Sequence, residues 1–164
     1  MWLLQYCLKY KNYNGLLEIV GGLNNPSVKR LSQTWKTMNK KYTDILGKLS
    51  LIVSPEHNWK NYRPLMQNEA PPLVPYIGLF LADLTFINDG NPTKVDGMIN
   101  WKKMKKLSAI LLQIQRAQQS QYTNIQPDPD AQAFLRQELF ILDDKELFKR
   151  SRLLEPPEVT QSKK

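Results

Sequence analysis

The sequence holds few of the side chains that build catalytic centres or metal sites. It contains one histidine, His57, and one cysteine, Cys7, in 164 residues. His57 stands in a polar turn, where a surface histidine is the usual case, and one histidine with one cysteine cannot supply the four ligands of a zinc site. Gly21-Gly22 lacks the lysine and the spacing of a phosphate-binding loop. We therefore predict no covalent catalysis, no metal, no cofactor and no nucleotide bound by this chain itself.

The composition is typical of one soluble, intracellular domain. Hydrophobic residues make up 41% of the chain, which is enough for a packed core at this length. The single Cys7 excludes an internal disulfide, and we expect it to be a small buried apolar residue. The start, Met1-Trp2-Leu3-Leu4, lacks the basic leader and the cleavage site of a signal peptide. We expect a cytoplasmic protein.

The net charge is +8, and lysines form two dense runs, Lys40-Lys41 and Lys102-Lys103 with Lys105-Lys106. Such runs can contact nucleic acid or an anionic lipid surface. More often they are solvated helix faces, and no nucleic-acid recognition motif accompanies them here. A basic nucleic-acid-binding domain is therefore the weakest hypothesis, and we predict no nucleic-acid partner.

One apolar stretch, residues 76–88, dominates the middle of the chain. Three prolines precede it, and the last of them, Pro75, fits the first turn of a helix, where no N–H is needed. Asp89-Gly90-Asn91-Pro92 follows it with turn chemistry. At helical spacing the side chains form two stripes, one of Tyr76, Leu79, Phe80, Leu84 and Ile87, the other of Ile77, Leu81 and Thr85.

A helix with apolar side chains nearly all round needs cover on both sides. At about 13 residues it is too short to span a bilayer, which takes about 20. Either it lies at the centre of a helical core, or one face packs on its own domain and the other on a partner. Without further information the buried core is the more common case.

The rest of the chain also follows helical periodicity, and no strand pattern competes with it. Ser27 and Ser54 are good N-caps, Asn100 can cap a long helix, and Asp143 or Asp144 can cap the last one. We expect an all-α fold with a polar loop over residues 89–96. The expected helices cover residues 1–8, 16–23, 28–35, 38–49, 56–66, 76–88, 101–117, 129–138 and 143–154.

Three stretches, in this order, carry a family resemblance. The first is NYNGLLEIVGGLN over residues 12–24 with VKRLSQTW over 28–35, the second is PPLVPYIGLFLADLTFINDGN over 71–91, and the third is GMINW over 97–101. The ending Leu153-Leu154-Glu155-Pro156 agrees with them. Together they cover about residues 5–157 and resemble the catalytic domain of the exchange factors that act on Ras-family small GTPases, the RasGEF family.

The resemblance implies a fold and domain boundaries. Members of the family have an irregular orthogonal helical domain with a protruding helical hairpin, and residues 71–91 resemble the hairpin's catalytic helix. Further N-terminal helices precede the equivalent of Met1 in the family. We therefore expect an N-terminally truncated exchange domain over residues 1–157 and a disordered tail over residues 158–164.

The resemblance also implies a function. Exchange factors of this family bind a small GTPase whose switch segments are displaced and whose Mg²⁺ site is spoiled, which releases GDP without covalent chemistry. The implied partner is a Rap- or Ras-like GTPase, and membranes are reached only through the lipidated GTPase. Thr85-Phe86-Ile87 resembles Rap-directed members more than Ras-directed ones. The chain is then an exchange factor rather than an enzyme of covalent chemistry.

Residue roles follow from the same resemblance. Thr85, where Ras-directed members often have leucine, and Asp89, where the family usually has glutamate, form the wedge at the Mg²⁺ and phosphate side of the nucleotide site. Asn14 matches a position that hydrogen-bonds switch II, and Asn91 matches one that meets switch I. The other implied GTPase-binding residues are Trp59, Tyr76, Leu79, Phe80 and Phe86.

The same residues also fit plainer roles. Asn14 fits a helix cap, Trp59 and Tyr76 fit core positions, and Asp89-Gly90 fits an ordinary turn. A second hypothesis for the whole chain is a catalytically incomplete helical module, which binds a small GTPase or another protein without exchanging its nucleotide.

Overall fold

The computed structural model describes residues 1–137 and 142–157. Residue 138 of the expected helix 129–138 and the expected tail, 158–164, lie outside the described residues. Contacts within the chain group it into two compact units. The first consists of Met1–Val20 with Ile45–Tyr122, and the second consists of Gly21–Asp44 with the described part of the chain after Tyr122.

Helices dominate both units, so the expected all-α fold is confirmed. Two-residue strands β1 (Lys94–Val95) and β2 (Met98–Ile99) form a small antiparallel ribbon. The helices of the described residues are α1 (Trp2–Lys9), α2 (Tyr13–Asn24), α3 (Pro26–Lys29), α4 (Ser32–Thr37), α5 (Lys40–Ile52), α6 (Glu56–Trp59), α7 (Arg63–Asn68), α8 (Ile77–Asp89), α9 (Trp101–Gln118), α10 (Pro129–Arg136) and α11 (Asp144–Leu154).

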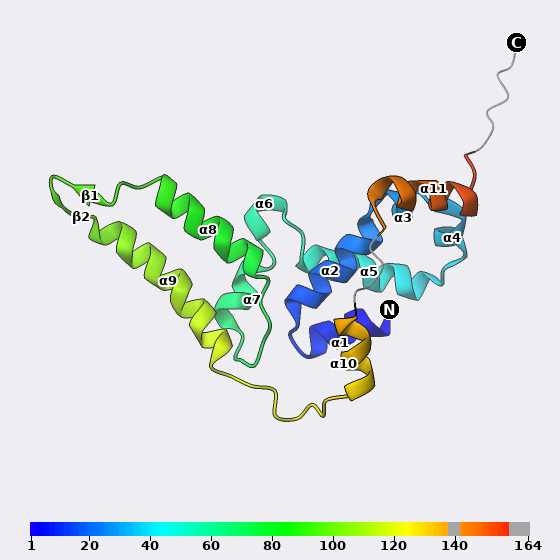
Figure 1. Ribbon diagram of the computed structural model, residues 1–164, viewed down its shortest axis with the longest axis horizontal. Helices are drawn as coiled ribbons and strands as arrows, with labels where there is room; N and C mark the ends of the chain where they lie inside the picture. The colour runs from blue at the N-terminus through cyan, green and yellow to red at the C-terminus, as the bar shows by residue number, and fades with distance from the viewer. Residues whose placement is uncertain (138–141, 158–164) are drawn as a thin grey trace, which may run out of the picture. The chain divides into compact units, whose positions relative to one another are not determined.

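A hairpin of two long helices is the main feature of the first unit. Helices α8 and α9 lie side by side, with β1 and β2 at the tip and α7 near the base (Figure 1). Leu79 and Phe80 of α8 and Ile110 of α9 are buried between them and the base. Among the described residues no helix, α8 included, has both the length and the apolar character that crossing a membrane requires.

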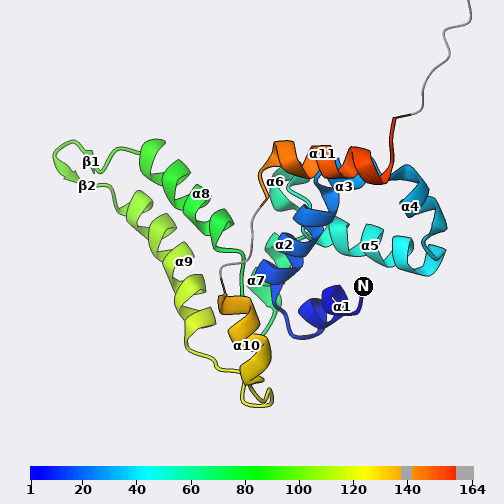
Figure 2. The same ribbon diagram turned by 45° about the vertical axis from the view of Figure 1, so that its right-hand side comes forward.

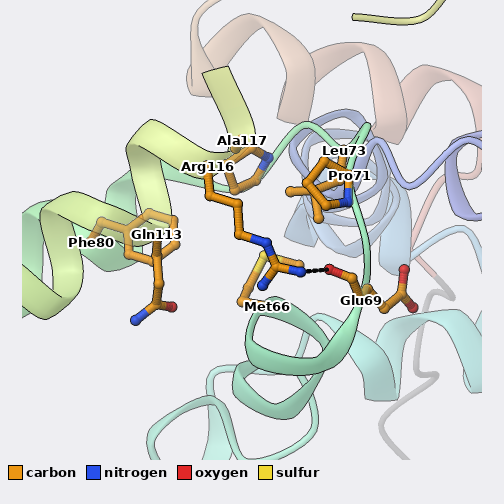
Figure 3. A pocket seen from close by; sticks show the side chains of 9 residues that line it. Met66, Glu69, Pro71, Leu73, Phe80, Gln113, Arg116 and Ala117 are labelled. Atoms are coloured by element: carbon orange, nitrogen blue, oxygen red, sulfur yellow. Dashed lines mark hydrogen bonds between the residues drawn. The ribbon is translucent and has the colours of Figure 1, made fainter. Parts of the chain in front are cut away.

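The base of the hairpin packs closely on α7 and on the segment after it. Arg116 of α9 donates a hydrogen bond to the backbone carbonyl of Glu69 at 3.3 Å (Figure 3). Met66, Leu73 and Phe80 line the same junction, where the remaining cavity measures about 10 Å³. A single water needs about that much room, so the junction is essentially filled.

The entry of the chain into α8 is tied to the start of α2 in the same unit. Val74 accepts a hydrogen bond from the Tyr13 N–H at 2.9 Å and donates to the Lys11 carbonyl at 3.0 Å. Tyr13 is buried beside α1, where Cys7 is buried as predicted. Burial raises the pKa of the Cys7 thiol, and the nearby Glu18 carboxylate raises it further. This cysteine is therefore an apolar core residue.

In the second unit, Arg30 joins α3 to the end of α11, which lies along it (Figure 2). Its guanidinium donates to the carbonyl oxygens of Ser151 and Glu155 at 2.7 and 2.8 Å. The same group lies 5.8 Å from the ring centroid of Phe148. Arg30 thus binds two carbonyls at the C-terminus of α11, where the helix dipole places negative charge; the Ser151 carbonyl also accepts from the Glu155 N–H at 3.0 Å.

The side chain of Glu155 caps the N-terminus of α4. Its carboxylate accepts hydrogen bonds from the backbone N–H groups of Gln33 and Thr34 at 3.0 and 2.7 Å. Leu31, the N-cap residue of α4, makes no side-chain cap bond, so a residue far along the sequence supplies it. Desolvation alone would raise the pKa of Glu155, but the hydrogen bonds from Thr34 and Gln33 and the charge of Arg30 outweigh it and lower that pKa.

Two expected N-terminal boundaries are wrong. Asn25, not Ser27, caps α3, because the Asn25 side chain accepts from the Ser27 N–H and Pro26 takes the first helical position. The expected helix 28–35 is broken between α3 and α4, where Leu31 leaves the helical conformation.

The start of the hairpin helix also differs from expectation. Pro75 does not begin it; Tyr76 is the N-cap and α8 begins at Ile77.

The stretch expected as one helix over residues 56–66 consists of α6 and α7 with a break between them. His57, Asn58 and Trp59 all have positive φ, at 50°, 57° and 61°. Ser54 still acts at the start, accepting from the Glu56 N–H at 3.3 Å. Left-handed conformations cost about 1–2 kcal/mol for each residue with a Cβ, so other contacts must hold this turn in place.

The tip of the hairpin also differs from expectation. The polar loop expected over residues 89–96 contains the end of α8 and the strand β1. Trp101, the first residue of α9, is 67% exposed. Asn100 caps α9 as predicted, and Asp143 caps α11, accepting from the Glu146 N–H at 2.7 Å.

The Glu155 cap predicts a stability that depends on pH. Because the folded state lowers the pKa of this carboxylate, the cap stabilises the fold above the ordinary pKa of 4.5. That contribution is lost as the pH falls through the folded-state pKa. We expect Glu155→Gln to lower the melting temperature at neutral pH, and the difference from wild type to shrink in acid, as measured by circular dichroism. Asp44→Asn, which changes an exposed carboxylate of α5, is the control; a Glu155→Gln difference that stays constant in acid contradicts the prediction.

Candidate functional site

The two stripes expected on α8 separate by their exposure. The covered stripe is buried or half-buried, and it consists of Tyr76, Leu79, Phe80, Leu84 and Ile87. The other stripe, Ile77, Leu81 and Thr85, is exposed. Of the two expectations for this helix, burial at the centre of a core is therefore wrong, and packing of one face on its own domain is confirmed.

We define the outer face of α8 as Ile77, Leu81, Thr85, Phe86 and Asp89. Ile77, Leu81 and Phe86 are 41%, 56% and 79% exposed. Thr85 lies four residues from both Leu81 and Asp89, so it stands in the middle of this face. An apolar surface of this kind on a folded domain typically marks a contact site.

The two polar side chains of the outer face, Thr85 and Asp89, differ in their hydrogen bonds. The Thr85 hydroxyl donates to the Leu81 carbonyl at 3.0 Å, which ties it to its own helix. Asp89 is exposed at the last residue of α8, and one carboxylate oxygen accepts from the Asn88 side chain at 3.3 Å. A carboxylate at a helix C-terminus is unfavourable by about 0.3–1 kcal/mol, because the helix dipole places negative charge there. Helix stability therefore does not explain why an acid stands at this position.

A buried lysine offsets the negative charge at this end of α8. Lys103 of α9 is only 3% exposed, and its ammonium donates to the Asn88 carbonyl at 3.0 Å and to the Thr93 hydroxyl at 3.1 Å. The expectation of a solvated lysine run is therefore wrong for Lys103, because it binds groups at the C-terminus of α8. Lys102 and Lys105 are exposed as expected.

Two asparagines complete the tip of the hairpin. Asn91 donates from its side chain to the Ile87 carbonyl at 2.9 Å, in the last turn of α8. Asn100 accepts from the Lys103 N–H at 3.1 Å and donates to the Pro92 carbonyl at 2.8 Å. These bonds fix the end of α8 to the start of α9, so the outer face is carried on a braced helix.

Four aromatic side chains gather at the base of α8. The rings of Trp59 and Tyr76 are 5.4 Å apart with an interplanar angle of 34°, and Tyr62 packs edge-on against Trp59 at 5.9 Å and against Tyr13 at 5.6 Å. Tyr62 is fully buried, and its hydroxyl accepts from the Tyr76 N–H at 2.7 Å. Burial raises the pKa of Tyr62 to about 12, although the hydrogen bond from Tyr76 acts in the opposite direction. Trp59 and Tyr76 are half-buried, so they are core residues that also reach the surface.

Arg63 holds the left-handed turn that carries Trp59. It donates from Nε to the Asn58 carbonyl and from Nη2 to the Asn58 side-chain oxygen, both at 2.8 Å. His57, in the same turn, is exposed as predicted. These bonds explain how three consecutive residues keep an unfavourable conformation.

The same Arg63 forms a two-pronged ion pair with Asp83 of α8. The nitrogen–oxygen distances are 2.6 and 2.8 Å. The hydrogen bond to Asp83, followed by its charge, raises the pKa of Arg63 against the effect of burial. Sequence reasoning missed this pair, although Asp83 is the one charged residue in the otherwise apolar stretch 76–88.

A surface groove of about 460 Å³ lies between this turn and α8. Its walls are mainly apolar, with the Arg63–Asp83 pair as the polar element. The other lining residues are Asn58, Trp59, Leu79, Ala82, Phe86, Ile87 and Ile110. The groove is large enough for apolar side chains of a partner, and Phe86 connects it to the outer face.

Asn14 lies at the start of α2, where its backbone N–H donates to the Val74 carbonyl at 3.3 Å. Its side chain donates to Glu18 at 2.6 Å. Asn14, Trp59 and Tyr76 therefore all belong to the region around the start of α8. Thr85, Phe86, Asp89 and Asn91 belong to its far half, and Leu79 and Phe80 are buried. Within residues 1–137 and 142–157 no cluster of His, Cys, Asp and Glu side chains forms a candidate metal site.

Comparison with known proteins adds a family match. The family model described as RasGEF domain matches residues 1–105. Ras guanine nucleotide exchange factor M of Dictyostelium discoideum is 34% identical over 155 residues, 93% of this chain and 17% of that protein. Ras-specific guanine nucleotide-releasing factor 1 of Mus musculus is 39% identical over 151 residues, 92% of this chain and 12% of that protein. The chain thus spans less than a fifth of the length of these relatives.

The aromatic cluster at the base of α8 leaves no room for a larger side chain at Gly78. A Cβ at Gly78 would lie 2.4 Å from the Tyr76 ring and hydroxyl, so the ring would have to leave Trp59. We expect Gly78→Ala to cost about 1 kcal/mol, the value of an aromatic pair, and to change the tryptophan fluorescence of the folded chain. Gly47→Ala in α5 is the control: beyond the adjoining backbone of α5, no atom lies within 4 Å of the Cβ it would gain, and it should stabilise by about 0.5–1 kcal/mol. Equal effects of the two changes would contradict the prediction.

The bonds of the buried Lys103 predict that the stability of the chain depends on this ammonium group. Lys103→Met keeps the alkyl chain but removes the charged hydrogen bonds to Asn88 and Thr93, which should cost about 1–3 kcal/mol in urea denaturation. Lys102→Met, at the exposed neighbouring position, should change the free energy of unfolding by no more than about 0.5 kcal/mol. Similar losses for the two variants would show that the buried ammonium is not what holds the tip.

Proposed function

The chain belongs to the RasGEF family, and from that premise we propose that it releases GDP from a small GTPase of the Ras family, using the outer face of α8. The observation that carries this proposal is the exposed apolar face of a braced helix, with Thr85 at its middle and the carboxylate of Asp89 at its end. Neither feature serves the stability of the domain itself.

Exchange requires differential binding rather than reactive side chains. A GTPase holds its nucleotide through phosphate contacts, Mg²⁺ and ordered switch segments. A partner that binds best when the switches are displaced weakens nucleotide binding by the same factor by which the nucleotide weakens the partner. Such a partner needs a rigid element inserted against the switches, and the bonds at both ends and at the middle of α8 supply that rigidity.

We assign the outer face of α8 from Leu81 onward to the nucleotide side of the GTPase. Leu81, Thr85 and Phe86 provide the apolar wedge, and Asp89 directs a negative charge toward the phosphate side of the nucleotide site, which repels the anionic phosphates. Asn91, bonded to the last turn of α8, lies beside Asp89 and is assigned to switch I.

The base of α8 is assigned to switch II. The half-buried rings of Trp59 and Tyr76 and the adjacent groove can take apolar side chains, and the Asn14 side chain can exchange its bond to Glu18 for one to the switch. Leu79 and Phe80 are buried, so in this proposal they act by holding α8 in place.

Two clues to the substrate differ. Relatives from mouse carry the words Ras-specific in their names, whereas Thr85-Phe86-Ile87 resembles Rap-directed members. We take Ras as the first candidate and Rap as the second.

The test is release of fluorescent GDP from purified Ras and Rap with the 164-residue chain. We expect acceleration on at least one of them. Thr85→Arg, at the centre of the outer face, and Asp89→Ala should each slow GDP release by about tenfold or more. A tenfold change requires the loss of only about 1.4 kcal/mol of transition-state binding.

Leu112→Asp is the matched control for Leu81→Asp, because Leu112 of α9 and Leu81 of α8 are similarly exposed, at 60% and 56%. Only the Leu81 variant should lose activity. Folded chain that binds a GTPase but never accelerates release would support the catalytically incomplete module instead. Folded chain that neither binds nor accelerates any Ras-family GTPase would overturn the proposed function.

A further inference from the structure

The tip of the hairpin exposes a second group of apolar side chains, separate from the outer face of α8. Val95, Met98, Ile99 and Trp101 are 48%, 70%, 62% and 67% exposed, and we name these four residues the tip patch. They belong to β1, β2 and the first residue of α9, at the far end of the hairpin from α7 (Figure 1). Exposing so much apolar surface to water is unfavourable, which indicates a covering environment.

The strand pairing places apolar side chains on both faces of the tip. Val95 lies opposite Met98, and Lys94 lies opposite Ile99. Because successive residues of a strand point to opposite faces, Val95 and Met98 share one face, and Ile99 lies on the other together with Lys94. A folded protein would cover one face of such a ribbon. A tip with apolar side chains on both faces, and a lysine beside one of them, suits a medium that surrounds it.

Exposed lysines flank the tip patch on both sides in the sequence: Lys94, Lys102, Lys105 and Lys106. Across residues 92–106 the one acidic residue is Asp96, in the turn between the strands. Lysine is depleted from the centres of protein–protein interfaces, but it is attracted to anionic lipid headgroups. The charge of the tip is therefore complementary to an anionic membrane.

We propose that the tip of the hairpin inserts into the headgroup region of an anionic membrane. Tryptophan is enriched at membrane–water interfaces, and the aliphatic side chains beside Trp101 add apolar area that is buried there. The lysines reach lipid phosphates while their alkyl stems stay among the apolar side chains. Asp96 opposes deep insertion, so the contact is shallow and reversible. It requires no GTPase and stands independently of the exchange function.

The first test is cosedimentation of the 164-residue chain with phosphatidylcholine vesicles containing about one third phosphatidylserine. We expect binding that is lost on pure phosphatidylcholine and weakened by salt. Ile99→Ser with Trp101→Ser should weaken binding about tenfold or more, because the apolar anchors are removed. Asp96→Asn should strengthen it, since the one acid of the tip loses its charge.

Matched variants elsewhere in the chain are the controls. Leu153→Ser with Leu154→Ser removes two side chains of α11 that are 75% and 74% exposed. The lysines of the tip are tested with the triple variant Lys102→Glu, Lys105→Glu and Lys106→Glu. Its control is the triple variant Lys36→Glu, Lys40→Glu and Lys41→Glu, which changes the net charge by the same amount. All variants are first checked for wild-type circular dichroism. If a control weakens vesicle binding as much as its tip counterpart, or if the wild type does not bind, the proposal is overturned.

Trp101 gives a second measurement that reports on depth. Vesicles made with brominated lipids quench tryptophans that enter the bilayer, and the chain has four tryptophans. We expect quenching of the wild type and its near loss in Trp101→Phe, which still binds because phenylalanine keeps most of the apolar area. Undiminished quenching in Trp101→Phe would place another tryptophan in the bilayer and would overturn the assignment of the tip.

Discussion

Helix α8 carries apolar side chains around nearly its whole circumference, and α9 covers only one side of it. Much of the first unit follows from this constraint. Leu79 and Phe80 use the covered side to join α8 to α9 and to the base. The remaining side stays in water at a cost of about 25 cal/mol for each Å² of apolar surface. A sequence that stabilised only its own fold would place polar residues at Leu81 and Phe86, so the exposed face is best explained by a partner that covers it.

Because one side of α8 is left uncovered, the helix must be held at its ends. At the base the hydrogen bond from the Tyr76 N–H to Tyr62 fixes where α8 begins, and the Arg63–Asp83 pair holds the middle of the helix. At the tip the ammonium of Lys103 binds the last turn. Polar bonds of this kind depend on direction and distance, so they set the position of the helix more sharply than apolar packing alone. An element that pushes against a partner's switch segments benefits from such bracing.

The sequence allowed accurate prediction wherever the determining interactions are local. The two stripes of α8 and the caps Asn100 and Asp143 depend on residues within one or two turns. Two of the wrong predictions concern side-chain bonds that helical periodicity does not show. The left-handed turn at Trp59 requires Arg63 to bind Asn58, and burial of Lys103 requires the end of α8 beside it. Neither partner is visible in helical periodicity.

Two departures from the family pattern on the outer face of α8 offset each other in the proposed exchange reaction. Asp89 in place of glutamate shortens the reach of the carboxylate by one methylene, about 1.5 Å. Thr85 in place of leucine removes bulk from the middle of the same face, and its hydroxyl is turned back to the Leu81 carbonyl. A less bulky centre lets the helix approach the GTPase more closely, which returns the shorter carboxylate to the nucleotide site. We infer that the two positions act as a pair, so that Asp89→Glu should help exchange only when Thr85 is also enlarged to leucine.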